Sequence, residues 1–263
     1  MKDWIHPMPE KAGKTLAISA WNDPHASNRD FTLNKDGWYS PLMPDLNQNN
    51  EKLLRYLIQN TIWWIEYAGL DGLRVDTYPY CERKQIAKWT KAIMNEYPHL
   101  NIVGEIWQPH TASVAYWQKD AKNYDGYNSF LPCVMDFPLM DVMQEAFVKD
   151  KPNRNKGTNQ LYASLAQDYL YTSHNNILTF IDNHDTERFA TLIGNDVDLY
   201  KAAIGFLLTT RGIPQLYYGT ELMMDSNKKG IYSSNANRKE MSGGWPGDKR
   251  NVFVAEGRRS INK

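Results

Sequence analysis

Three short segments of the sequence each lead an apolar run into a carboxylate. They are Gly72-Leu73-Arg74-Val75-Asp76, Val103-Gly104-Glu105-Ile106-Trp107 and Phe180-Ile181-Asp182-Asn183-His184-Asp185. If each run is a strand of one parallel sheet, its acid lies where the strand ends, and the acids share one edge of the sheet. Cleavage of a glycosidic bond needs such a group, because one carboxylate attacks the anomeric carbon while a second carboxyl protonates the departing oxygen. A third carboxylate can stabilise the positive charge that develops on the sugar.

The first two acids each have an ordinary alternative. Arg74 precedes Asp76 by two residues, so both side chains point to the same face of a strand. The arginine would keep Asp76 ionised and oriented, as a nucleophile requires, although a structural ion pair has the same spacing. Glu105 is followed by Trp107. A partly buried carboxyl beside an aromatic ring has the raised pKa of a general acid, and an ordinary glutamate at a strand end is the alternative.

The third acid, Asp185, closes a run of four polar residues after a buried strand. A helix N-cap is the alternative, and it is weaker here because Asn183 and His184 arrive together with the aspartate. A metal site could be formed by His184 with Asp182 and Asp185, but no second histidine stands at ligand spacing. We therefore predict no metal among the site residues.

Composition excludes several classes of function. The 263 residues carry 30 basic and 30 acidic side chains, so the net charge gives no reason to bind nucleic acid or an anionic membrane. No apolar run reaches the ~18 residues of a membrane span. The start, Met1-Lys2-Asp3-Trp4-Ile5, lacks the apolar region of a signal peptide. Two cysteines, Cys81 and Cys133, are too few for a disulfide framework, and we expect buried free thiols. Nine Trp and sixteen Tyr fit stacking on sugar rings, although most will be core.

Strands and helices alternate after an irregular beginning. Residues 1–48 are rich in Pro, Asn, Asp and Gly and predict a long loop or a small subdomain. Beyond them, strands are expected at 73–75, 101–104, 133–136, 177–181 and 212–218, and helices from 49 or 50 to about 68 and at 82–97, 139–149, 160–171 and 199–209. This alternation predicts an α/β fold with a parallel sheet and helices outside it.

The joint pattern resembles the α-amylase family of glycoside hydrolases. The segments 72–76, 104–107 and 180–185 resemble its β4, β5 and β7 signatures in the family's order, 212–221 resembles β8, and 43–47 resembles a short segment near the end of its domain B. The resemblance covers nearly the whole chain. It implies that Asp76 is the nucleophile, Glu105 the acid/base and Asp185 the transition-state stabiliser. Arg74 would orient the nucleophile, and His184 would bind sugar hydroxyls.

One departure concerns substrate binding. Many members have Lys and His three and four residues after the nucleophile, where this sequence has Pro79 and Tyr80. We therefore expect an aromatic platform at Tyr80 on the leaving-group side, with Trp107 as a further candidate for substrate binding.

The stretch 56–80 resembles neopullulanases of gut Bacteroidetes starch-utilisation systems in particular. That resemblance implies a retaining, double-displacement hydrolase of maltodextrins, pullulan or cyclodextrins in the periplasm, with α-linked glucan oligosaccharides as partners. No cofactor is expected, and a structural calcium ion and the oligomeric state stay open. Preference for α-1,4 or α-1,6 bonds, and for hydrolysis or transglycosylation, also stays open. A non-catalytic carbohydrate-binding relative is one alternative, disfavoured because all three acids are in place with Arg74 and His184. A non-catalytic partner-binding relative, which binds partners through the open edge of the barrel, is a second alternative and stays open.

A second departure is larger. The family's β3 segment, an Asp followed by Asn-His, is not in the sequence, and neither are the elements before it or a C-terminal β domain. We therefore expect a partial TIM (β/α)8 barrel that has β4–β8 and lacks β1–β3. Residues 1–48 would be the remainder of domain B, the long β3–α3 loop, and 49–263 an incomplete catalytic barrel. An open barrel exposes its inner face, so we expect this chain alone to be an inactive fragment.

Overall fold

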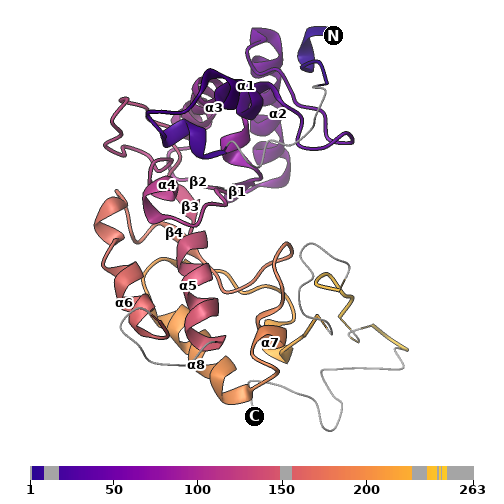
Figure 1. Ribbon diagram of the computed structural model, residues 1–263. Coiled ribbons are helices and arrows are strands. Elements are labelled where there is room, and N and C mark those ends of the chain that lie inside the picture. The colour runs from indigo at the N-terminus through magenta and orange to yellow at the C-terminus, as the bar shows by residue number, and fades with distance from the viewer. Residues whose placement is uncertain are drawn as a thin grey trace. The chain divides into compact units, whose positions relative to one another are not determined.

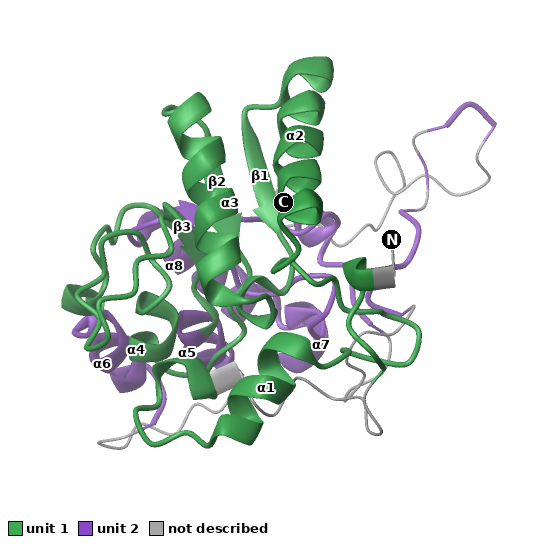
Figure 2. Ribbon diagram, turned by 90° about the horizontal axis from the view of Figure 1, so that it is seen from above, with its two compact units in different colours: residues 1–137, 168–178 green, residues 138–167, 179–263 purple. Residues whose placement is uncertain are grey.

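The computed structural model describes residues 2–8, 18–148, 156–226, 236–241, 243 and 245–247. The chain divides into two compact units (Figures 1 and 2). The first comprises Met1–Phe137 and Asp168–Leu178, and the second comprises Pro138–Gln167 and Thr179–Lys263. Among the described residues, no helix combines the length and apolar character that a membrane crossing requires.

The sheet of the first unit brings its strands together in chain order. β1 (Gly72–Val75), β2 (Asn101–Gly104), β3 (Cys133–Met135) and β4 (Ile177–Thr179) pair in parallel, each with the next. Parallel strands leave all their carboxyl ends at one edge, so the residues that follow β1 and β2 are neighbours. These are four of the five strands that the sequence predicts.

Two long helices accompany β1 and β2. α2 (Glu51–Ala68) begins at Asn50, whose side chain accepts hydrogen bonds from two backbone amides, and ends at Gly69 in the left-handed conformation. α3 (Arg83–Glu96) packs against α2 (Figure 2). Both helices are found where the sequence predicts them.

Two shorter helices of the first unit were not predicted, α1 (Asn28–Asp36) and α4 (Thr111–Ala115). α1 lies inside the segment expected to be irregular, and Asn34 is its only buried residue. A helix whose buried position is polar has no apolar period to read. Both cysteines are free thiols, with Cys133 buried and Cys81 only half-buried.

A tight contact in the core of the first unit lies directly before the second acid. Tyr78 is fully buried, and a Cβ on Gly104 would come within 2.6 Å of the Leu131 side chain and 3.2 Å of the Tyr78 ring. Glycine at this position therefore lets the Tyr78 ring pack against the end of β2. Other large members of this core are Trp21, Ile102, Trp117 and Val134.

The second unit is mainly helical and has its own core. Its helices are α5 (Phe137–Val148), α6 (Asn159–Leu165), α7 (Phe189–Leu192) and α8 (Val197–Thr209), and its core includes Leu139, Tyr200, Ala203 and Leu207. β5 (Ile213–Pro214) follows β4 in the order of the sheet, and the Gln215 amide donates to the Thr179 carbonyl at 2.7 Å.

Two elements of this region are shorter than predicted. The expected strand at 212–218 is limited to Ile213–Pro214, where a proline removes a ladder donor. The helix expected at 160–171 ends at Leu165, and a separate 3-10 turn covers Asp168–Leu170.

Candidate active site

The register of β1 and β2 places Asp76 beside Glu105. Val75 is paired with Gly104, and each acid is the next residue of its strand. The Glu105 amide donates to the Val75 carbonyl at 2.9 Å, which continues the ladder for one more step. Both carboxyls therefore leave the sheet at the same edge.

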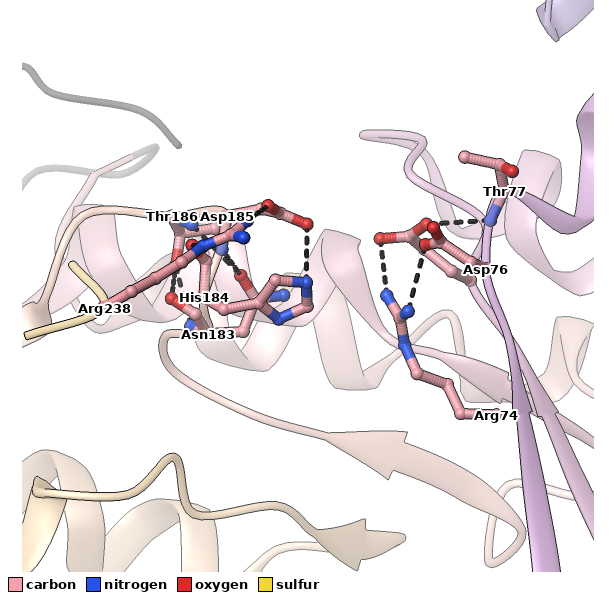
Figure 3. A network of polar contacts seen from close by, with 9 residues as sticks. Arg74, Asp76, Thr77, Asn183, His184, Asp185, Thr186 and Arg238 are labelled. Atoms are coloured by element: carbon pink, nitrogen blue, oxygen red, sulfur yellow. Dashed lines mark hydrogen bonds and ion pairs between the residues drawn. The ribbon is translucent and has the colours of Figure 1, made fainter. Parts of the chain in front are cut away.

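Arg74 joins the two carboxyls. One guanidinium nitrogen donates to Asp76 Oδ1 at 3.0 Å (Figure 3). The other donates to Glu105 Oε1 at 3.0 Å. Arg74 reaches Asp76 because side chains two residues apart share one face of a strand. A charged donor shared by two acids fixes the orientation of both and favours their ionised forms.

The two carboxyls differ in environment. The Asp76 side chain is 63% exposed, whereas the Glu105 side chain is 5% exposed. Burial, and then the Asp76 carboxylate, raise the pKa of Glu105 to about 7, while the Thr77 amide and Arg74 act in the opposite direction. The pair is thus suited to two roles, with an exposed anion next to a buried acid that holds a proton near neutral pH.

Thr77 contributes a hydrogen bond that the sequence did not reveal. Its amide donates to Glu105 Oε2 at 2.9 Å, and its φ of 46° lies in the left-handed region. That conformation is rare for a β-branched residue, and nothing in the sequence marks Thr77 for it.

Two aromatic candidates lie in the same unit. Tyr80 ends a 3-10 turn, and its ring meets Tyr39 edge to face, with centroids 5.8 Å apart. Burial raises the pKa of Tyr80, and the charges of Tyr39 and Glu105 raise it further, so the phenol lies within electrostatic range of the acid. Trp107 is 38% exposed and stacks on Phe137, with centroids 4.9 Å apart.

The third acid belongs to the second unit, in the loop after β4. Asp185 Oδ2 lies 3.0 Å from His184 Nε2, and Oδ1 accepts from Arg238 at 2.6 Å (Figure 3). The loop is folded by Asn183, whose Oδ1 accepts from the amides of Asp185 and Thr186. Arg238 also donates to the His184 carbonyl at 3.1 Å. Sequence reasoning missed Arg238, because it lies 53 residues after Asp185 with no motif around it.

The neighbouring Asp182 has a different environment. It is buried, and its Oδ2 accepts from the Phe189 amide at 2.8 Å, at the start of α7. Burial raises the pKa of Asp182 to about 6, with the Phe189 amide and Arg188 acting in the opposite direction. Asp182 is therefore the acid that receives the helix amide, while Asp185 pairs with the Arg238 guanidinium and contacts His184. Among the described residues, no three His, Cys, Asp or Glu side chains gather as metal ligands.

Known proteins are similar to this chain in sequence and in fold. The profile of the α-amylase catalytic domain matches residues 1–250. Over 205 residues, the chain is 32% identical to a cyclomaltodextrin glucanotransferase of Bacillus licheniformis and 32% identical to an α-amylase of Niallia circulans, covering 77% of this chain in both cases. It spans 27% and 37% of those two proteins.

Solved structures of α-amylases have the same fold over most of this chain. The α-amylase of Geobacillus thermoleovorans, complexed with acarbose, superposes with a TM-score of 0.67 at 28% identity and covers 85% of this chain and 45% of its own. An α-amylase of Anoxybacillus superposes with a TM-score of 0.69 at 25% identity and covers 90% of this chain and 46% of its own. The predicted fold class, a TIM barrel present in part, is confirmed.

Proposed function

Since the chain belongs to the α-amylase family of glycoside hydrolases, we propose that it carries the acid pair of a retaining α-glucan hydrolase. The observation that supports this most directly is the pair of neighbouring carboxyls joined by Arg74, one exposed and one buried. Retaining enzymes hold their two carboxyls roughly 5–5.5 Å apart, a spacing that one guanidinium can bridge. Asp76 is the nucleophile of this proposal and Glu105 is its acid/base.

Bond cleavage then proceeds in two balanced steps. The Asp76 carboxylate attacks the anomeric carbon as the glycosidic bond breaks, and Glu105 transfers its proton to the departing oxygen. Glu105, now ionised, takes a proton from water, which attacks the glycosyl–enzyme ester and releases the sugar and Asp76. Carboxyls and water suffice for both steps, so the proposed chemistry uses no cofactor.

The other candidate residues have supporting roles in the proposal. Asp185, held by His184 and Arg238, stabilises the positively charged transition state, and His184 also binds sugar hydroxyls. Tyr80 and Trp107 offer ring faces for sugar stacking.

We propose maltodextrins, pullulan and cyclodextrins as substrates, in a neopullulanase-type enzyme of the periplasm. The matched relatives are named as amylases and cyclomaltodextrin glucanotransferases, which is compatible with α-linked glucans. A glycosyl–enzyme can also react with a second sugar in place of water, so transglycosylation is part of the same proposal.

We further propose that this 263-residue chain is inactive by itself. The sheet of the described residues has five strands, whereas a closed barrel has eight. Catalysis requires the acids to be held within about 0.5 Å of productive geometry by a rigid surrounding, which an open sheet does not supply. Purified chain incubated with maltoheptaose, pullulan and β-cyclodextrin should release no reducing sugar. Turnover of about 1–1000 per second would refute this part of the proposal.

The roles are tested in the full-length gene product with Asp76→Asn and Glu105→Gln. Asp76→Asn should prevent formation of the glycosyl–enzyme. Mass spectrometry of enzyme that has reacted with an activated fluoro-sugar and has then been quenched detects this intermediate by its added mass. Glu105→Gln should lower kcat/KM on maltoheptaose by about 100-fold or more, but should affect the first step on an aryl glycoside with a good leaving group much less. Asp71→Asn, at the opposite end of β1, is the matched control. Equal losses for both variants on the aryl glycoside would contradict the assignment.

A further inference from the structure

One backbone carbonyl next to the acid pair receives two side-chain donors from a distant part of the chain. The Pro79 carbonyl accepts from Trp21 Nε1 at 2.7 Å and from Asn34 Nδ2 at 3.0 Å. Both donors are buried, Trp21 at 4% exposure and Asn34 at 0%. They come from the irregular beginning of the sequence, 58 and 45 residues before the proline.

A buried asparagine is unfavourable at the position of Asn34 unless its hydrogen bond to the Pro79 carbonyl is needed for function. Asn34 is the only buried residue of α1, and its Oδ1 is buried without a hydrogen-bond partner. A buried polar atom without a hydrogen-bond partner destabilises a fold, so an apolar residue would stabilise this helix contact better. The side chain therefore serves the Pro79 carbonyl at the expense of local stability.

Trp21 is held from other sides as well. Its ring packs against Phe31, with centroids 5.5 Å apart, and the Arg83 guanidinium lies 5.3 Å from the ring centre. Arg83 is itself fixed by Asp125 and Tyr116. The indole N–H is thus presented to Pro79 by a rigid surrounding.

The carbonyl that they hold belongs to the turn that follows Asp76. Tyr78, fully buried, is anchored by its hydroxyl on Thr90 at 2.8 Å, and its amide donates to the Glu105 carbonyl at 3.2 Å. Before it, Thr77 has its left-handed backbone and donates its amide to the Glu105 carboxyl at 2.9 Å. A strained conformation persists only where the surrounding structure enforces it, and the fixed Pro79 carbonyl supplies one such restraint.

We propose that Trp21 and Asn34 are positioning residues for Glu105, which they hold through the Pro79 carbonyl and the Thr77 amide. The inference rests on the proposed function, since it assigns the N-terminal segment a part in placing the proton donor. Neither side chain touches Glu105. Their effect passes through two peptide units of one short turn.

The expected consequence has a definite sign. Glu105 is faced by Asp76 and Arg74 from β1 and by the Thr77 amide and Tyr80 from the turn. The amide favours the ionised carboxylate, so loosening the turn should raise the pKa of Glu105. The acid must be protonated to act, and the alkaline limb of the pH–rate profile should therefore move to higher pH, while the rate at the optimum falls because the carboxyl is less well oriented.

The test compares three substitutions in the full-length gene product. Trp21→Phe removes one donor and keeps an aromatic ring. Asn34→Leu removes the other donor together with the unpaired oxygen, so the variant should fold as well as the parent or better. Trp38→Phe is the matched control, because its indole also donates to a backbone carbonyl, that of His6 at 3.0 Å, in the same segment.

Trp21→Phe and Asn34→Leu should each move the alkaline limb of the pH profile of kcat/KM to higher pH by about 0.5 pH unit. A shift of this size corresponds to a partial weakening of the hydrogen bond from the Thr77 amide to the Glu105 carboxylate. Both substitutions should lower kcat on maltoheptaose about threefold to tenfold, and much less on an aryl glycoside with a good leaving group. A carbon-13 NMR titration of the Glu105 carboxyl should show the same pKa shift without turnover. Trp38→Phe should match the parent in all three measurements.

Two failures are distinguishable. If Glu105→Gln leaves maltoheptaose hydrolysis intact, the proposed function is wrong. The positioning role alone is wrong if two results are found together. Glu105→Gln would lose maltoheptaose hydrolysis, and the pH profile and carboxyl titration of Trp21→Phe and Asn34→Leu would not differ from those of Trp38→Phe.

Discussion

The acid pair of the first unit and the Asp185 cluster of the second unit hold carboxylates by different means. Asp76 and Glu105 are placed by the register of two parallel strands, and the arginine that joins them is two residues from Asp76. Asp185 is placed by a loop, and its arginine comes from 53 residues later in the chain. The Arg74–Asp76 contact is indicated by a spacing of two residues in the sequence, whereas the Arg238–Asp185 contact forms only when folding brings together residues that are 53 positions apart.

The difference extends to how strongly each carboxyl is constrained. Arg74 serves two acids at once, and one of them is nearly inaccessible to water. Arg238 serves one acid and is itself 47% exposed, so solvent competes for its hydrogen bonds. A charged pair with exposed partners contributes less than a pair in a buried surrounding. Comparing the loss of activity when each arginine is removed therefore measures how strongly each region constrains its carboxylates.

The largest effect is expected for Arg74→Met in the full-length gene product. The substitution removes the donor that orients both carboxyls, and we expect kcat/KM on maltoheptaose to fall about 100- to 1000-fold, which is about 3–4 kcal/mol of barrier. Loss of the positive charge should also raise the pKa of Glu105 and move the alkaline limb of the pH profile upward. Steady-state kinetics across pH measure both effects.

The same substitution at an exposed position of α2, Arg55→Met, is the control and should leave kcat/KM unchanged. A loss of less than tenfold for Arg74→Met would show that the register of β1 and β2 positions the acids without the arginine. The contrast between the two regions would then lose its basis.

Much of this first region could be predicted from the sequence. An apolar run that ends in an acid indicates a strand end, and the spacing of Arg74 and Asp76 indicates a shared face. The four strands β1–β4 and the helices α2 and α3 are confirmed as well, and α2 in particular has a clear apolar period and caps at Asn50 and Gly69. The functional roles of the acids stay a prediction.

Other features could not be predicted, because they depend on contacts made only after folding. The left-handed backbone of Thr77 follows from the packing of the turn, and Trp21 and Asn34 meet Pro79 across 45 or more residues. Asn34 even conceals its helix, since a buried asparagine breaks the apolar pattern. Polar side chains that bond to distant backbone leave no periodic signal.

A smaller effect is expected for Arg238→Met. Asp185 would keep its contact with His184 and its loop geometry, so we expect kcat/KM to fall about tenfold, or about 1.4 kcal/mol. Arg238→Lys should restore only part of the loss, because the arginine donates from two separate nitrogens, to Asp185 and to the His184 carbonyl. Lys239→Met, which removes the next cation along the chain and its pair with Asp225, is the control. A loss as large as that of Arg74→Met would show that exposure does not weaken this carboxylate site.

The smallest effect concerns strain in two left-handed turns, one in each unit. In the second unit, left-handed backbone before α8 is assigned to Gly194 and Asn195, residues that tolerate it. In the first unit, the same conformation falls on the β-branched Thr77. Thr77→Asn keeps the amide that donates to Glu105 and relieves the strain, so we expect stability to rise by about 0.5–1 kcal/mol, or about 2 °C in Tm.

The reverse substitution in the other unit, Asn195→Thr, should lower Tm by a similar amount, and differential scanning calorimetry measures both. The alkaline limb of the pH profile should not move in Thr77→Asn, because the donor to Glu105 remains. If Thr77→Asn lowers Tm while Asn195→Thr also lowers it, the threonine is stabilised by its own side-chain contacts. Its left-handed backbone would then be a favourable feature of the turn, and the restraint from Pro79 would not be needed to maintain it.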